Sequence, residues 1–202
     1  MIDFIAPRIK LVRMWTRDAL IAHLGAGGTA DYLMFWGGTP KDPKLTDASC
    51  LSQWFPARFE VDGVAYTTAE HFMMAAKARL FGDEQAVAKI LSASTPAEAK
   101  AHGRAVRGYQ DDAWENARVE AVVRGNVAKF GQNEALGAFL RATRHRVLVE
   151  ASPRDAIWGI GMGSSDPDAR IPARWRGRNL LGFALMEARA RLFPDRARSA
   201  SA

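Results

Sequence analysis

Runs of apolar residues at regular spacing divide the first half of the sequence into predicted elements. DYLMFWGG is typical of a buried strand, and RFEVDGVAY alternates around Asp62-Gly63, a dipeptide that favours a type I′ hairpin turn. That hairpin leads directly into YTTAEHFMMAAKARLF, where apolar side chains fall on most sides of a predicted helix. Before these elements we expect a short strand around residues 9–14, then a helix that Thr16 begins and the GAGG at residues 25–28 ends.

The second half of the sequence alternates between capped helices and a long loop. Asp83 is a predicted N-cap, and TPAE at residues 95–98 predicts a capping box with proline in the first helical position. DDAWENARVEAVVRGNVAKFG and NEALGAFLRAT repeat apolar residues at helical spacing, the first up to a glycine stop at Gly131. RVLVEAS then predicts a strand, PRDAIWGIGMGSSDPDARIP a loop, and NLLGFALMEARARLF a closing helix that begins near Asn179.

The length and charge of the chain fit one medium-sized domain with an anionic partner. A chain of 202 residues buries roughly 70% of the surface that its unfolded form exposes, so no disulfide is needed for stability. We expect an N-terminal extension at residues 1–30, the main domain at residues 31–194, and a disordered basic tail at residues 195–202. The formal net charge of +6, from 28 Lys and Arg against 22 Asp and Glu, favours phosphates or nucleic acid as partners.

The single cysteine and the lack of long apolar runs bear on the cellular compartment. Cys50 alone excludes an intramolecular disulfide and a CxxC metal site, which fits a reducing cytoplasm. Its side chain suits either a small buried hydrophobe or a nucleophile. No apolar run approaches the ~20 residues that span a bilayer, and MIDFIAPRIKLVRMW has charges where a signal peptide is apolar. We therefore expect a soluble cytoplasmic protein with no membrane partner.

Glu70 and Lys77 are charged residues of the otherwise apolar helix, and two interpretations of each are open. They lie seven positions apart, so their side chains share one face, displaced by about 10 Å along the axis. Thr67 to Glu70 fits a capping box, which would make Glu70 structural. Lys77 in turn suits an amine that reaches water from the edge of the core. The alternative is a partly desolvated Glu and Lys lining one pocket, an arrangement that tunes the pKa values of acids, bases and nucleophiles.

The glycine-rich loop before the last helix contains further candidates. Trp158 offers a flat face to a base or sugar, or else fills the core, and Asp155 either orients a hydroxyl or forms an Asx turn. GRN at the start of the last helix supplies backbone N–H groups that suit an anion. His71, His102 and His145 lack metal-ligand spacing. We expect neither a metal nor a cofactor.

Five sequence motifs follow one another in an order that is far more specific than any one of them. They are FWGG, LSQWFPARFEVDGVAYTTAEHFMMAAKA, GRAVRGYQDDAWENARVEAVVRGNVAKF, LVEASPRDAIWGIGM and WRGRNLLGFALMEAR. In this order the chain resembles the NADAR domain, also called the YbiA-like family, from about Tyr32 to Phe193. The resemblance implies a mainly helical α+β fold, a single compact domain with a small β-hairpin or sheet element, that hydrolyses N-glycosidic bonds.

The resemblance also assigns roles to individual residues. It makes Glu70 and Lys77 catalytic, with Glu70 as the general acid/base and Lys77 as a nucleophile or the group that tunes Glu70. The residues that the motifs bring to the substrate are Trp36, Trp54, Phe55, His71, Trp114, Asp155, Trp158, Gly159 and Asn179. In this hypothesis Trp54, Trp114 and Trp158 stack on the base or ribose, while Asn179 and nearby arginines hold phosphate.

Two substrate classes are associated with such domains, and both place ribose C1 on an exocyclic amine. One is ADP-ribosylated guanine in nucleic acid or a nucleotide. The other is a phosphorylated ribosyl-amine small molecule, a phosphoribosylamino-pyrimidine intermediate of riboflavin synthesis. We favour removal of ADP-ribose from guanine. A non-catalytic module that binds ADP-ribose or nucleic acid is the competing class, and the sequence leaves the oligomeric state open.

Overall fold

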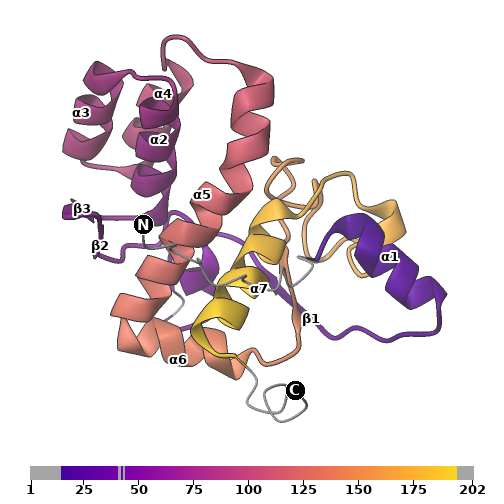
Figure 1. Cartoon of the computed structure of the whole chain (residues 1–202). Coiled ribbons are helices and arrows are strands. Elements are labelled where there is room, and N and C mark those ends of the chain that lie inside the picture. The colour runs from indigo at the N-terminus through magenta and orange to yellow at the C-terminus, as the bar shows by residue number, and fades with distance from the viewer. Residues whose placement is uncertain (1–14, 41, 43, 195–202) are drawn as a thin grey trace, which may run out of the picture.

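The computed structural model describes residues 15–40, 42 and 44–194, and its architecture is mainly helical (Figure 1). Along the chain the elements are α1 (Arg17–Gly25), β1 (Tyr32–Phe35), the 3-10 helix η1 (Ala48–Leu51), β2 (Phe59–Val61), β3 (Val64–Tyr66), α2 (Ala69–Leu80), α3 (Glu84–Ser92), α4 (Pro96–Arg104), α5 (Asp111–Gln132), α6 (Glu134–Ala142), β4 (Val147–Glu150), the 3-10 helix η2 (Pro172–Arg174) and α7 (Leu180–Leu192). The strand expected at residues 9–14 and the tail at residues 195–202 lie outside the described residues. None of the helices in the described part of the chain has the length and apolar character needed to cross a membrane.

The short strands pair into two small sheets. β1 and β4 run parallel, with Phe35 opposite Glu150, and β2 and β3 form the predicted antiparallel hairpin. At its turn, Asp62 and Gly63 have φ values of 52° and 75°, the left-handed conformation that a type I′ turn requires at both positions. The hairpin delivers the chain into α2, as the sequence predicts.

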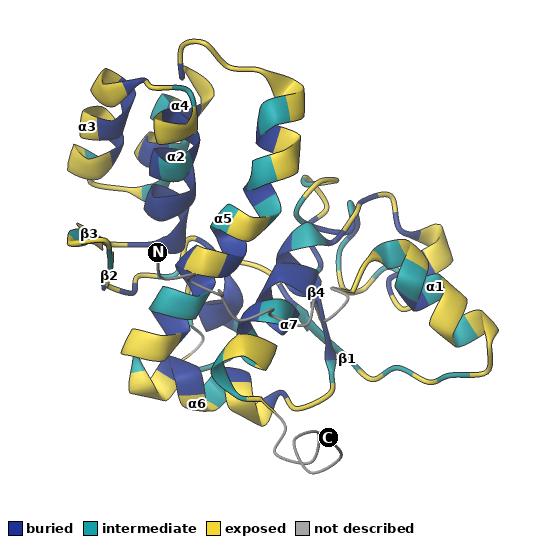
Figure 2. Ribbon diagram, in the orientation of Figure 1, coloured by how far each residue is buried: buried dark blue, intermediate teal, exposed yellow. Residues whose placement is uncertain are grey.

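The helices enclose one core around the long helix α5. In Figure 1, α5 runs through the middle of the molecule, with α2, α3 and α4 on one side and α7 on the other. It packs against α2 and α7, and α7 also packs against β4. Figure 2 shows that the faces that these elements turn toward one another are buried, among them Phe72, Val122 and Phe183, each at most 3% exposed. The expected fold class, mainly helical α+β with a small sheet element, is confirmed.

Side-chain caps begin several helices where the sequence predicts them. Thr16 caps α1 and Asp83 caps α3, each by accepting a backbone N–H of the first turn. Thr95 and Glu98 form the predicted capping box of α4, with proline in its first turn. α5 ends at Gln132, one residue past the predicted glycine stop.

The start of α2 differs from the prediction by one residue. Thr68, rather than Thr67, is the N-cap, and its hydroxyl accepts a hydrogen bond from the N–H of His71. Glu70 therefore occupies the second helical position, where it cannot complete a capping box, because that role belongs to the third. The predicted capping box of Thr67 and Glu70 is wrong, since either of two adjacent threonines fits the pattern. The Glu70 carboxylate is left available for another purpose.

α1 packs on the loop that leads into α7. The Arg17 guanidinium donates to the carbonyl oxygens of Pro172 and Ala173, both at 2.9 Å. Leu20 is fully buried in the common core. The described residues of the expected extension thus contribute to the packing of the domain, and the boundary at residue 30 stays a prediction.

Candidate active site

Three segments meet beyond the carboxyl ends of β1 and β4. They are the first turn of α2, the residues after η1 and the loop after β4. The backbone N–H of Glu70 donates to the carbonyl oxygen of Gln53 at 3.0 Å, which joins the first two segments. The N–H of Ala151 donates to the carbonyl oxygen of Phe35 at 2.9 Å, which extends the strand pairing just past Glu150. These backbone contacts fix where the side chains of Glu70 and Glu150 begin.

Glu70 is a buried carboxyl with one oxygen that lacks a partner. Its side chain is 2% exposed, and no described residue forms a hydrogen bond with Oε1. Burial raises the pKa of Glu70 to about 7, against the opposing effects of Lys100 and of a hydrogen bond from the Trp54 indole. A carboxyl that ionises near neutral pH and keeps an oxygen free has the properties of an acid or base catalyst.

Glu150 is a half-buried carboxyl beside the first, and the sequence reasoning missed it. Its Oε2 is buried and has no hydrogen-bond partner among the described residues. Burial raises the pKa of Glu150 to about 8, with further contributions from the negative charges of Asp155 and Glu70, while Lys100 opposes the shift. The available signal was its position: it is a charged residue that ends a buried strand at the carboxyl end of a parallel pair, where ligand sites commonly lie.

Lys100 of α4 is the cation that both glutamates share. Its positive charge lowers the pKa values of Glu70 and Glu150, and its Nζ lies 5.8 Å from the centroid of the Trp54 ring. The sequence pattern does not single it out, because PAEAKAHGR mixes charged and small residues as a solvent-facing helix does. We refer to Glu70, Glu150, Asp155 and Lys100 as the carboxylate cluster.

Asp155 shapes the loop after β4 and also belongs to the carboxylate cluster. Its Oδ1 accepts hydrogen bonds from the backbone N–H groups of Ile157 at 2.9 Å and Trp158 at 2.8 Å, which confirms the predicted Asx turn. Gly159 follows, and a Cβ there would lie 2.8 Å from the carbonyl oxygen of Glu150, too close for any side chain. The tight loop therefore brings the Asp155 charge near both glutamates.

Lys77 lies on the same helix as Glu70 but has partners of its own. Its Nζ donates to the carbonyl oxygen of Gly103 at 2.9 Å and lies 4.0 Å from the centroid of the Tyr109 ring. Burial lowers the pKa of Lys77, and the charge of Arg104 lowers it too. The positive charge of Arg104 also lowers the pKa of Glu70, so Arg104 influences both side chains. Among the described residues, no salt bridge joins Lys77 to Glu70.

His71 and Asn179 are committed to the fold. His71 is 2% exposed, with Nδ1 2.7 Å from the Thr68 hydroxyl and Nε2 3.2 Å from a backbone carbonyl oxygen after α3. Asn179 is fully buried; its amide donates to the carbonyl oxygen of Leu148 at 2.9 Å, and its Oδ1 accepts the N–H of Glu150 at 2.9 Å. These contacts are at odds with the expectation that both side chains bind substrate. Asn179 instead ties the start of α7 to the strand end that carries Glu150.

The tryptophans differ in how much surface they offer. Trp36 is 60% exposed and Trp54 is 41% exposed, and a Cβ on Gly38 would lie 3.2 Å from Cβ of Trp54. The loop after β1 therefore packs directly on Trp54. Trp158 is half-buried, whereas Trp114 is only 7% exposed and belongs to the core of α5. Trp36, Trp54 and Trp158 keep faces on which a base could stack.

Lys129 holds the segment before Trp54 in place. Its fully buried Nζ donates to the carbonyl oxygens of Cys50 at 2.7 Å and Ser52 at 2.8 Å, and lies 5.6 Å from the centroid of the Phe55 ring. Burial lowers the pKa of Lys129 to about 7. Cys50 is itself fully buried, which raises the pKa of its thiol to about 12, so it is the small buried hydrophobe rather than a nucleophile.

Arginines gather beside the loop that carries Asp155. Glu115 of α5 accepts hydrogen bonds from Arg118, at 2.7 Å, and from Arg178. The backbone N–H of Arg178 donates to the carbonyl oxygen of Ala156, next to Asp155, at 2.9 Å. Nε of Arg118 is buried without a partner in the described part of the chain. The charge of Asp111 also acts on Glu115, so two carboxylates face the two guanidiniums, and the N–H of Arg118 is the feature that suits a phosphate oxygen.

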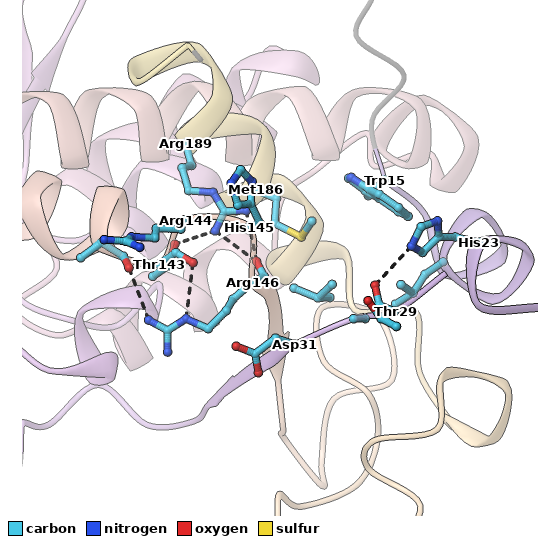
Figure 3. Close-up of a pocket in the computed structure, with 14 residues that line it drawn as sticks. Trp15, His23, Thr29, Asp31, Thr143, Arg144, His145, Arg146, Met186 and Arg189 are labelled. Atoms are coloured by element: carbon cyan, nitrogen blue, oxygen red, sulfur yellow. Dashed lines mark hydrogen bonds between the residues drawn. The ribbon is translucent and has the colours of Figure 1, made fainter. Parts of the chain in front are cut away.

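A cavity of about 690 Å³ lies at the opposite end of β1 and β4 (Figure 3). Its walls come from α1, from α7 and from the turn between α6 and β4. Arg189 serves the packing of this region, since its guanidinium donates to Thr143 Oγ1 at 2.5 Å and to the carbonyl oxygen of Arg146 at 3.1 Å. The carboxylate cluster does not line this cavity, so we do not assign the cavity to the site.

The raised pKa of Glu70 predicts a pH-dependent stability. Between about pH 4.5 and 7 the folded protein keeps a proton on Glu70 that the unfolded chain has lost, so the free energy of unfolding falls as pH rises through this range. Glu70→Gln is neutral at every pH and lacks this effect. We expect the variant to be more stable than the unaltered protein by on the order of 3 kcal/mol at about pH 8 and nearly equal to it at about pH 4.5. Denaturant titrations at both pH values measure the difference, and a difference independent of pH would contradict the assignment.

Comparison with known proteins finds relatives along most of the chain. The family model of the NADAR domain matches residues 34–193. N-glycosidase R617 of Acanthamoeba polyphaga mimivirus is 39% identical over 167 residues, which cover 80% of this chain and 96% of that protein. N-glycosidase YbiA of Escherichia coli (strain K12) is 34% identical over 146 residues, which cover 72% of this chain and 81% of YbiA.

A solved structure and a longer relative extend the comparison. The NMR structure of the E. coli protein YbiA matches this fold with a TM-score of 0.63 and 30% sequence identity, over 81% of this chain and 86% of that one. Riboflavin biosynthesis protein VVA0006 of Vibrio vulnificus (strain YJ016) is 32% identical over 142 residues, 70% of this chain but 35% of that protein. The matched region contains the whole carboxylate cluster. In sequence and in fold, the chain belongs to the NADAR domain family.

Proposed function

We propose that this protein is an N-glycosidase, a hydrolase that cleaves the bond between ribose C1 and an exocyclic amine. The observation that carries the proposal is the Glu70 carboxyl, which is 2% exposed, has a free Oε1, and lies near Lys100 and Trp54. Hydrolysis of a glycosidic bond needs a carboxylate to activate water or to stabilise the positive charge that develops at C1. The names of the relatives R617 and YbiA, both N-glycosidases, support the same activity.

In this mechanism Glu70 acts on the water. Its carboxylate takes a proton from water as the water oxygen bonds to C1 and the C1–N bond breaks. The exposed faces of Trp54 and Trp158 bind the base by stacking. Arg118, with its unused Nε–H, and Arg178 hold phosphate by charge-assisted hydrogen bonds. Lys77 contributes its positive charge from the far end of the same helix face.

We favour ADP-ribosylated guanine as the substrate. ADP-ribose brings two phosphates and an adenine besides the reacting ribose, and a larger anionic ligand uses more of the surrounding arginines and tryptophans. The net charge of +6 supports an anion of this size. A phosphoribosylamino-pyrimidine is the second candidate, and the name of the relative VVA0006, a riboflavin biosynthesis protein, favours it.

Assays of the purified protein on both substrate classes test the proposal. Release of ADP-ribose together with unmodified guanine supports the favoured activity. Release of ribose phosphate from the phosphoribosylamino-pyrimidine alone would redirect the substrate assignment and keep the N-glycosidase class. Binding of either compound without any turnover would contradict the proposal and favour the non-catalytic module.

The role of Lys77 is tested by trapping with borohydride. We expect no ribosyl adduct when borohydride is added during turnover, because the Lys77 amine donates to Gly103 and packs on Tyr109, whereas a nucleophilic lysine needs a free amine that faces C1. Lys77→Arg, which keeps the charge but cannot form this imine, should retain part of the activity. Mass spectrometry that finds the sugar on Lys77 or Lys100 would contradict direct attack by water and establish a covalent route.

A further inference from the structure

We propose that Glu150 is a second catalytic residue, the acid that protonates the departing amine while Glu70 removes a proton from the attacking water. The inference rests on the proposed N-glycosidase activity and adds a residue to it. Glu150 ends β4, and Glu70 lies in the first turn of α2; the two carboxyls are near enough that the charge of one acts on the other. A pair of carboxyl groups with separate roles is the common requirement of glycoside hydrolysis.

The backbone of Glu150 is held rigidly at the strand end. Its N–H donates to Oδ1 of Asn179 at 2.9 Å, and its carbonyl oxygen accepts the N–H of Ile160 at 2.9 Å. On the other side, strand pairing sets it opposite Phe35. A catalytic group must be fixed relative to the reacting atoms, and elements of regular structure fix it better than free loops do. These contacts account for the backbone of Glu150, while its Oε2 has no hydrogen-bond partner among the described residues.

One carboxyl oxygen on each of the two glutamates lacks a hydrogen-bond partner among the described residues, which indicates that a bound ligand supplies the partner. Oε2 of Glu150 and Oε1 of Glu70 are both buried and lack a hydrogen-bond partner among the described residues. Folded proteins leave few buried polar atoms unpaired, and such atoms at one place require an explanation. The substrate amine nitrogen and the attacking water supply one partner each.

The surroundings assign the two roles. The negative charge of Glu70 raises the pKa of Glu150 on top of the effect of burial, so the pair favours a proton on Glu150 while Glu70 is ionised. The charge of Asp155 acts in the same direction, and Lys100 from α4 opposes it for both glutamates. Asp155 itself is committed to its loop, because its Oδ1 accepts two backbone N–H groups.

The proposed step balances in atoms and charge. As the water oxygen bonds to C1, one water proton passes to the Glu70 carboxylate. The electron pair of the C1–N bond goes to the amine nitrogen, which takes the proton of Glu150. The products are a ribose hydroxyl and a free amine. Transfer of one proton from Glu70 to Glu150 through solvent restores the starting state.

Glu150→Gln tests the proposal when it is assayed on two leaving groups. The first substrate is the amine N-glycoside, and the second is the same ribosyl group on 4-nitrophenolate, which departs without being protonated. We expect kcat/KM to fall by about 100-fold or more on the amine and by less than about 5-fold on the nitrophenolate, since general acid catalysis matters only for the first. Glu60→Gln, at an exposed glutamate of the hairpin, is the matched control and should change neither value.

Each outcome of the leaving-group experiment supports or contradicts the role of Glu150. Equal losses on both leaving groups would overturn the role of Glu150, because a residue that only shapes the site affects both reactions alike. Failure of the unaltered protein to hydrolyse the amine N-glycoside would overturn the proposed function and this inference with it. If Glu150→Gln does not fold, Glu150→Asp decides through its pH profile. The alkaline limb of the pH profile of kcat/KM reports the loss of the proton from the acid. A shift of this limb in Glu150→Asp supports the proposal, and an unchanged limb refutes it.

Discussion

Glu70→Gln is expected to lower the turnover of the amine N-glycoside by about 1,000-fold while the protein stays folded. Glutamine keeps the shape of the side chain and can still accept the hydrogen bond from the Trp54 indole. It cannot take a proton from water, and it carries no charge to stabilise the developing cation at C1. Steady-state kinetics on the purified variant measure the loss, and circular dichroism spectra check that the fold is retained.

The matched control is Thr68→Ala, which removes the N-cap of the same helix two residues earlier. The Thr68 hydroxyl accepts the N–H of His71, so its loss should lower the free energy of unfolding by about 1 kcal/mol. Turnover should fall far less than in Glu70→Gln. If the two variants lose stability alike and both keep their turnover, Glu70 is a structural residue of the helix start and the proposed mechanism fails.

Local sequence patterns were sufficient where one interaction decides the structure. Asp62-Gly63 predicted its turn because few dipeptides tolerate two successive positive φ values, and the structure has both. The capping box of Thr95 and Glu98 is confirmed as well, because Pro96 favours the first helical position and so fixes Thr95 as the cap. At the start of α2, two adjacent threonines compete for the cap, and Thr68 takes it.

The site was harder to predict because its residues meet only in the fold. Glu70 was marked by its place in an apolar helix. No local sequence pattern singles out Glu150, since a charged residue at the end of a short strand is commonly solvated. Its importance follows from the pairing of β1 with β4, which brings residues 115 positions apart in sequence into register. Lys100 is an ordinary helix lysine until α4 packs beside α2.

Asn179 is the opposite case, a residue that the motif marks and whose side chain serves the backbone in the structure. The motif around it suggests contact with phosphate, and the start of a helix is a suitable place for an anion. In the structure its φ of 55° turns the chain into α7, and its side chain serves the backbone of β4. Because the Asn179 amide is fully buried and binds two backbone groups, its contact with phosphate stays a prediction. Side-chain hydrogen bonds of this kind depend on tertiary contacts that no sequence window contains.

Lys129→Met is expected to lower both stability and activity without touching the substrate. The substitution keeps most of the stem but removes the amine that the carbonyl oxygen of Cys50 accepts from, and it leaves the carbonyl oxygen of Ser52 with only the N–H of Phe55 at 3.3 Å. One buried group without a partner costs about 1–3 kcal/mol, so the free energy of unfolding should fall by about that amount. The loosened segment carries Trp54, whose indole bonds to Glu70, so kcat/KM should fall as well.

The pH dependence of this loss separates Lys129 from a lysine that merely packs well. Burial lowers its pKa from 10.5 to about 7, so between these values the unfolded chain holds a proton that the folded protein has lost, and folding becomes more favourable as pH rises. Methionine has no such dependence, and the stability gap between the two proteins should therefore widen from about pH 6 to about pH 9. Lys89→Met, at an exposed position on α3, is the control and should change stability by less than about 0.5 kcal/mol at either pH. Denaturant titrations at the two pH values measure the gap. A constant gap, or a Lys129→Met variant with undiminished kcat/KM, would show that the lysine does not hold the Trp54 segment in its working position.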